Sequence, residues 1–326
     1  MLKKIAKSGE YVHFLMIGII LVFYYFTAPV TAKSQLPSLY TAPLGVWIQD
    51  FSILYPTLGK LINVILIAVT SLFVNKIGTS TEILPRQSFI TSTILALFLL
   101  FSPETSQFTG SLVLLLLLTF SFSNMIGIFG KQYPFQQILN ATLAISVSSL
   151  IIPQSIVFIV FIWLGFFTYS VNTFREWIIS FIGLAIPYIY MFFAWYWYDN
   201  LGYFYEIYAN YFKTFSIAFN APHTYQIITL ALLALIYFSS LFYFINTTSE
   251  KIINVRKRMW LTFQFSFISI VTLAIGGKSS FLILPLVYIS MSIMLSYSIH
   301  YQKQTRIQDI LMLLLIISIF INRVVV

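Results

Sequence analysis

The chain has 326 residues, of which 59% are hydrophobic and only 8% are charged, against roughly 25% charged in a typical soluble domain. So few charges exclude a soluble enzyme of this size, and an aromatic content of 18% excludes a disordered chain. The net charge of +9 invites a nucleic-acid partner, but the positions of the basic residues give it another meaning. The absence of cysteine excludes disulfides, thiolate metal sites and cysteine nucleophiles. The composition predicts an all-α, polytopic integral membrane protein.

Apolar runs approaching the roughly 20 residues that cross a bilayer predict the transmembrane helices. Cutting the sequence at charges and prolines gives about eleven of them: 11–28, 54–75, 88–102, 111–128, 138–152, 154–170, 177–198, 223–245, 260–275, 281–299 and 307–322. The shortest, including 88–102 and 138–152, need flanking polar residues that reach the interface or a locally thinner bilayer.

Pro153 separates the fifth and sixth runs and allows two interpretations. The two runs form a tight hairpin, or they form one long kinked helix, which would invert every later loop. Basic residues favour cytoplasmic loops, so they distinguish the two topologies. With a hairpin and a cytoplasmic N-terminus, 13 of the 18 Lys and Arg residues fall inside, whereas a kinked helix places the basic cluster 251–258 outside. We therefore expect the hairpin, and basic residues that contact anionic lipid rather than nucleic acid.

The N-terminus has the features of a secretory signal, with Lys3, Lys4 and Lys7 before an apolar run and Val30-Thr31-Ala32 after it. The apolar run 11–28 is long for a signal, which favours a retained first span. We expect a single transmembrane domain over 1–326, without a soluble domain.

Two connections on the outer side predict one or two interfacial helices. In 34–52, apolar residues recur at roughly helical spacing between prolines, and the segment ends at Asp50. In 200–219, aromatic residues form one stripe, and Glu206, Asn210 and Lys213 form another at i, i+4 and i+7. The polar stripe faces a cavity between the spans, or it is the solvated side of an ordinary aromatic belt.

The candidate catalytic residues are the outward acids Asp50 and Glu104, because carboxylates are the general bases that this composition offers. The alternative for each is helix capping, with Asp50 as the N-cap of a helix that begins at Phe51. Glu206, Asn210, Lys213, His223 and Lys278 are the candidate substrate-binding residues, and the two last could contact a phosphate. The three histidines are far apart and share no ligand spacing, so no metal site is predicted.

On the inner side, Arg175 and the cluster Arg256-Lys257-Arg258 are candidates for contact with lipid headgroups or a partner protein. Arg175 has a second interpretation as part of an interfacial anchor, since Glu176 and Trp177 follow it at the start of a span. The basic cluster also has a simpler role as the signal that orients the protein.

The stretch from the second to the seventh span resembles a family of uncharacterised polytopic membrane proteins from Bacteroidota. The resemblance rests on five short motifs: Leu84-Pro85-Arg86, Phe101-Ser102-Pro103-Glu104, Asn140 with the hairpin at Pro153, Phe174-Arg175-Glu176-Trp177, and Gly183 with Pro187. It implies a location in the bacterial inner membrane and no established activity.

The architecture is also similar to that of the membrane glycosyltransferases (GT-C type) that use polyprenyl-phosphate sugars. In that class an acid of the first outer loop acts as a base or metal ligand, and Asp50 stands at the matching position. The usual acidic pair near the end of the first span is absent, since 29–33 reads Pro-Val-Thr-Ala-Lys.

Two functions therefore compete. One is a membrane-embedded subunit or scaffold of an envelope assembly, with membrane lipids and other envelope proteins as partners. The other is an enzyme or transporter that acts on a polyprenyl-phosphate-linked glycan at the outer side of the inner membrane. No cofactor is evident, and a divalent cation belongs only to the glycosyltransferase hypothesis.

Overall fold

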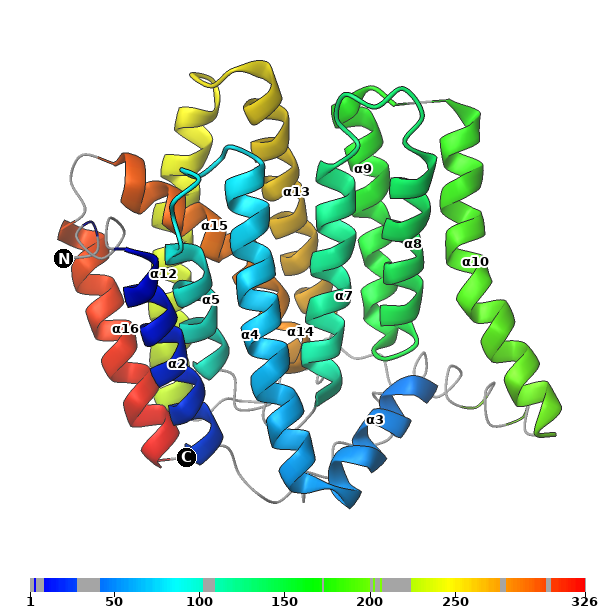
Figure 1. Ribbon diagram of the computed structural model, residues 1–326, viewed down its shortest axis with the longest axis horizontal. Helices are drawn as coiled ribbons and strands as arrows, with labels where there is room; N and C mark the ends of the chain where they lie inside the picture. Colours follow the sequence, from blue (N-terminus) through cyan, green and yellow to red (C-terminus); the bar gives the residue numbers. More distant parts are fainter. Residues whose placement is uncertain are drawn as a thin grey trace.

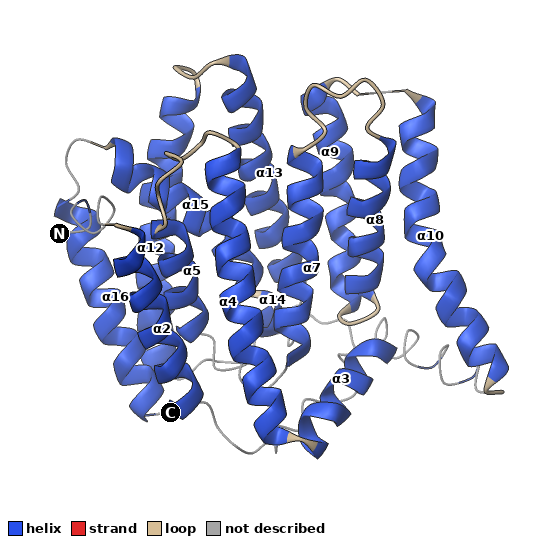
Figure 2. Ribbon diagram, viewed as in Figure 1, coloured by secondary structure: helices blue, strands red, loops and turns tan. Residues whose placement is uncertain are grey.

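The computed structural model describes residues 9–27, 42–101, 109–171, 173–199, 224–275, 280–302 and 306–325, together with Lys3, Gly202 and Glu206. Within these residues the chain forms helices joined by turns, without any strand (Figure 2). The all-α prediction is confirmed.

The helices follow the apolar runs of the sequence. Their bounds are α2 Glu10–Thr27, α3 Pro43–Leu54, α4 Pro56–Ser80, α5 Ile90–Phe101, α7 Thr109–Ile126, α8 Phe135–Ser149, the 3-10 helix η2 Pro153–Phe158, α9 Ile159–Tyr169, α10 Phe174–Trp197, α12 Thr224–Thr248, α13 Ile253–Ile275, α14 Ser280–Ile283, α15 Pro285–Tyr301 and α16 Arg306–Val325. Each predicted run coincides with one helix, or with two consecutive ones for 154–170 and 281–299.

Most of the helices stand side by side in one bundle, and their ends gather at two opposite edges (Figure 1). The connections 81–89, 127–134 and 249–252 lie at the upper edge, whereas α3 and the turn 150–152 lie at the lower edge. The N-terminus is marked at the upper part of the view and the C-terminus at the lower part.

Six helices in the described part of the chain are long and apolar enough to cross a membrane: Glu10–Thr27, Pro56–Ser80, Thr109–Ile126, Phe174–Trp197, Ile227–Thr248 and Ile253–Ile275. These are the helices of a multi-pass membrane protein. Several of the other predicted spans form shorter helices; α5, with 12 residues, is about 18 Å long at 1.5 Å per residue. Its position explains how a short helix is accommodated, since α4, α2 and α15 pack around it.

The central helix is α15, whose side chains are buried on every side from Leu286 to Ile299 apart from Val287. It lies against α5, α12 and α13. Its buried serines are satisfied within the helix, because Ser292, Ser296 and Ser298 donate to backbone carbonyls three or four residues earlier at 2.6–2.8 Å. These serine hydroxyls of α15 therefore need no charged partner, although the helix lies at the centre of the bundle.

The connection at Pro153 is a hairpin. Helix α8 ends at Ser149, and the amides of Ile151 and Ile152 donate to the Ser148 carbonyl at 3.1 and 3.0 Å. Pro153 then opens η2, where its missing N–H costs no helical hydrogen bond. The hairpin prediction is confirmed, and the single kinked helix is wrong.

Helix α10 packs mainly on α8 through a face of small and polar residues. The Ser146 hydroxyl donates to the Leu184 carbonyl at 2.7 Å, and the Ser149 and Tyr188 hydroxyls are 2.7 Å apart. Just before these two contacts along both helices lies Gly183, where an added Cβ would overlap Oγ1 of Thr142. Close contact between small residues and hydroxyl bonds is how helices associate where lipid removes the hydrophobic driving force.

Candidate functional site

Asp50 lies on α3, which crosses the lower edge of the bundle (Figure 1). Pro43 begins this helix, and two backbone bonds attach its start to the α8–η2 turn: Ala42 N to Ile151 O and Leu44 N to Leu150 O, both 3.0 Å. The helix matches the second half of the predicted interfacial segment 34–52 and continues to Leu54. Residues 34–41 fall outside the described part of the chain.

The side chain of Asp50 is exposed, and it makes no hydrogen bond or ion pair with any residue that the structure describes. It is not an N-cap, because α3 runs unbroken through Asp50 and Phe51, and the next helix has Tyr55 in the capping position. The capping alternative is wrong. One turn earlier, Trp47 faces Trp195 of α10 with ring centroids 6.5 Å apart, which joins the first half of α3 to the last turn of α10.

Of the other candidates predicted for the outer side, the structure describes only Glu206. Glu206 is described as helical and exposed, at an isolated position in 200–219. Five candidates lie outside the described residues: Glu104, Asn210, Lys213, His223 and Lys278. The rest of the predicted interfacial helix at 200–219, except Gly202, does so as well.

No group of three or more His, Asp or Glu side chains in the described ranges could hold a metal ion. His13 is buried on α2, and Nε2 of His300 lies 2.7 Å from the Ser88 hydroxyl.

The inner basic residues have different surroundings. Arg175 in the first turn of α10 and Arg256 in the first turn of α13 are exposed. Lys257 places its ammonium 5.6 Å from the centre of the Phe129 ring, within the range of a cation–π contact. Arg258 donates from Nη1 to the carbonyl of Thr81 at 3.0 Å.

Arg258 thus binds the end of α4, where Thr81 is the C-cap residue. A cation at a helix C-terminus interacts favourably with the carbonyls that the helix leaves unbonded. Its Nε is buried without a hydrogen-bond partner among the described residues, as is the hydroxyl of Tyr169 at the end of α9. The predicted basic cluster therefore divides into an exposed Arg256 and an Arg258 that joins α13 to α4.

Glu176 is predicted from the sequence to belong to an interfacial anchor, but its side chain is only 4% exposed. It accepts a hydrogen bond from the hydroxyl of Thr173, the N-cap residue of α10. Thr173-x-x-Glu176 has the spacing of a capping box, and this signal could have identified the buried carboxylate. Trp177 packs on α9, with its ring centroid 5.6 Å from that of Trp163.

A second feature that sequence reasoning missed is a cluster of aromatic residues at the upper ends of α12 and α15. Tyr297 and Tyr301 stack with centroids 4.7 Å apart, and the ammonium of Lys251 lies 4.3 Å from the Tyr301 ring centre. The i, i+4 spacing of these tyrosines on α15 predicts that they contact each other. It does not predict that Lys251, in the connection between α12 and α13, lies close to them.

A family model described as a family of unknown function (DUF6427) matches residues 38–325. No curated protein and no solved structure matches the chain.

Proposed function

The chain belongs to the DUF6427 family of unknown function, and we propose that it works as a membrane-embedded structural subunit of an envelope assembly. In this proposal about eleven helices cross the bacterial inner membrane, with the N-terminus in the cytoplasm. Membrane lipids and other envelope proteins are its partners.

The proposal rests on the face of α10 that points away from the bundle. Its buried face is made of Glu176, Ser180, Gly183, Pro187 and Met191. The opposite face presents large apolar side chains to the surroundings, among them Ile189 at 52% and Phe193 at 63% exposure. Small residues inward and large apolar residues outward are typical of a helix in lipid, where association depends on close packing.

The position of α10 makes this face accessible to another protein. The helix forms one flank of the bundle (Figure 1) and packs mainly on α8. Its two ends are fixed by aromatic contacts, from Trp177 to Trp163 of α9 and from Trp195 to Trp47 of α3. Because α10 is held in place from one side, its aromatic side is a preformed surface for a transmembrane helix of a partner.

Removing that surface should release the chain from its assembly. We expect the double variant Ile189→Ala/Phe193→Ala to migrate as a smaller particle than the native chain when mildly solubilised membranes are separated by native electrophoresis. The matched control is Phe238→Ala/Phe242→Ala on α12, an i, i+4 pair with 64% and 70% exposure. If both variants and the native chain migrate alike, the surface on α10 holds no partner.

The orientation has a direct test because the chain has no cysteine. Arg256 and Asp50 are both exposed and lie at opposite edges of the bundle. In intact spheroplasts, a membrane-impermeant maleimide should label Asp50→Cys and spare Arg256→Cys, which should react only after the membrane is opened. The reverse pattern would invert the topology.

An enzyme or transporter acting on a polyprenyl-phosphate-linked glycan remains the second candidate, and the exposed Asp50 on α3 is the observation that favours it. There Asp50 would serve as a base, or hold a divalent cation against the pyrophosphate. Asp50→Asn separates the two functions. A structural subunit should retain its complex and its cellular role in this variant, whereas loss of the role with an intact complex would favour the enzyme.

A further inference from the structure

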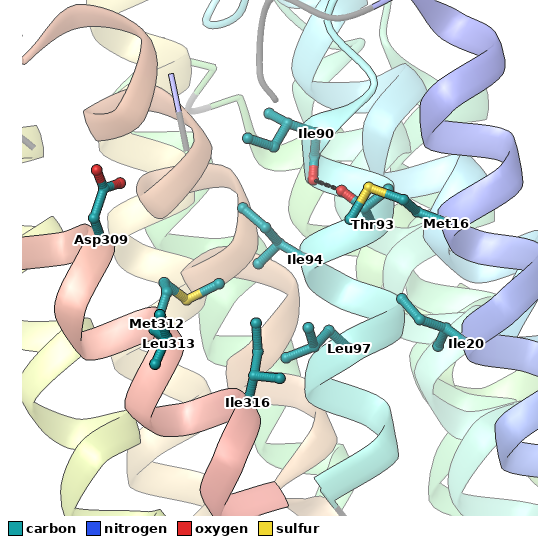
Figure 3. Close-up of a pocket in the computed structure, with 10 residues that line it drawn as sticks. All are labelled: Met16, Ile20, Ile90, Thr93, Ile94, Leu97, Asp309, Met312, Leu313 and Ile316. Atoms are coloured by element: carbon teal, nitrogen blue, oxygen red, sulfur yellow. Dashed lines mark hydrogen bonds between the residues drawn. The ribbon is translucent and has the colours of Figure 1, made fainter. Parts of the chain in front are cut away.

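An apolar groove of about 110 Å³ lies between α2, α5 and α16 (Figure 3). Its lining includes Met16 and Ile20 of α2, Ile94 and Leu97 of α5, and Met312 and Ile316 of α16. Helix α5 forms the floor, with Ile90, Thr93 and Ile94 buried. The first and last helices of the described chain form the two walls.

The wall of the groove is almost free of polar groups. The Thr93 hydroxyl donates to the carbonyl of Ile90 at 2.7 Å, so it is satisfied within its own helix (Figure 3). Among the described residues that line the groove, Asp309 is the charged one; its carboxylate lies at one end and points away from the apolar side chains. A ligand in the groove would therefore meet methyl and methylene groups along its length and a carboxylate at the mouth.

The groove is elongated along the helices and closed below. The floor extends along α5 from Ile90 to Leu97. This is seven residues, or about 10 Å along the helix axis. Beyond this length the two walls meet, since the rings of Phe23 on α2 and Phe320 on α16 have centroids 4.7 Å apart. The shape is a slot that is open near Asp309 and stops at an aromatic pair.

We propose that this groove binds one acyl chain of a membrane phospholipid. The helices beside it present exposed apolar side chains, among them Leu15, Ile19 and Leu313, so the groove is continuous with the surface that faces lipid. A helix of a partner protein, about 10 Å across, is too wide for it. An apolar cavity of comparable size, about 150 Å³, stays dry and accepts a small hydrocarbon.

The selectivity of the site comes from packing. A lipid tail is already in an apolar medium, so transfer into the groove gains little hydrophobic free energy. What the groove adds is a fixed wall and two adaptable side chains, Met16 and Met312, whose thioethers fill irregular gaps around a chain. The bound acyl chain would contact both α2 and α16. Because a ligand that binds only the folded state stabilises that state, the lipid would raise the stability of the protein.

The inference rests on the proposed membrane location. Its test uses proteoliposomes of phosphatidylethanolamine and phosphatidylglycerol that contain a phospholipid with a diazirine in one acyl chain. After illumination, adducts mapped by mass spectrometry should concentrate on 90–97 of α5 and 312–316 of α16. The walls of the slot shield α5 from bulk lipid, so adducts there require entry into the groove.

Two variants that fill the groove provide the contrast. Thr93→Phe adds a ring to the floor, and Leu313→Trp adds bulk from an exposed position at the rim, where the fold should tolerate it. We expect at least a fivefold loss of adducts on α5 in each variant. Leu235→Trp on α12, which is also exposed, should leave them unchanged.

Adducts spread evenly over the exposed helices, and equal in all variants, would overturn the inference. The inference would also be overturned if α5 of the native chain carried no adducts, which is the result expected when a protein segment covers the groove. The maleimide labelling and native electrophoresis described above are independent of these variants. If those experiments succeed while the adducts fail, only the acyl-chain site is rejected.

Discussion

Replacing Gly183 should separate α10 from the bundle. A Cβ at this position would overlap Oγ1 of Thr142 and lie 2.9 Å from Cβ of Thr142 and 3.3 Å from the carbonyl oxygen of Leu139. Rotation of Thr142 cannot relieve all three contacts, and its hydroxyl is already bonded to the carbonyl of Ile138 at 2.9 Å. The two helices must therefore move apart, which weakens the hydroxyl bonds at Ser146 and Ser149.

We expect Gly183→Ala to lower the free energy of unfolding by about 1–3 kcal/mol, the usual cost of overpacking. Gly183→Leu should prevent α10 from docking and greatly reduce the yield of monodisperse protein. The measurement is thermal unfolding in detergent, followed by size-exclusion fluorescence.

Gly18→Ala is the matched control, because Gly18 lies inside α2 and a Cβ there meets nothing within 4 Å. By helix propensity alone this control should be neutral or gain up to about 1 kcal/mol. The double variant Thr142→Gly/Gly183→Ala moves the missing Cβ to the other helix and should recover part of the loss. Equal melting temperatures for Gly183→Ala and Gly18→Ala would refute the close contact.

The helices themselves could be predicted from the sequence because long apolar runs end where prolines and charges stand. Pro43, Pro56, Pro153 and Pro285 each occupy the first helical position of an element, as their lack of an N–H favours. The hairpin at Pro153 followed from charge alone, since it was needed to keep the basic cluster 251–258 on the inner side.

The packing of the helices could not be predicted in the same way. In a soluble protein the apolar face of a helix points inward, but α10 buries Ser180 and Gly183 and exposes Phe193. The periodicity of apolar residues therefore does not predict which face of a transmembrane helix is buried. The spacing of small residues is the better indicator of the buried face. The central position of α15 is equally hard to predict, because its apolar residues and its serines are distributed around the whole helix and leave no preferred face.

The candidate site was predicted only in outline. Asp50 is exposed, as an acid outside the bundle should be, but the interfacial segment is expected to end there and α3 instead continues through it. The partners of Arg258 and Lys251 lie far along the chain, and local spacing cannot reveal them. The glycosyltransferase hypothesis rests on Asp50, whose suggested companions, apart from the exposed Glu206, fall outside the described residues.

Arg258→Ala should destabilise the fold. From the sequence alone, Arg258 is indistinguishable from the other two basic residues of its cluster. Its guanidinium donates to Thr81 at 3.0 Å and joins the start of α13 to the end of α4. Hydrogen bonds from charged groups contribute about 1.5–3 kcal/mol, and truncation also removes the packing of the aliphatic stem. We expect Arg258→Ala to cost about 2–3 kcal/mol, measured as a fall in the melting temperature.

Two substitutions distinguish this role from a general effect of charge. Arg256→Ala removes the same charge from an exposed position and should change stability by no more than about 0.5 kcal/mol. Arg258→Lys keeps the cation near the α4 carbonyls but loses the fixed geometry of the guanidinium, so an intermediate loss is expected. If Arg256→Ala and Arg258→Ala cost the same, Arg258 acts only through its charge. A loss confined to position 258 would instead assign it to the packing of α13 against α4.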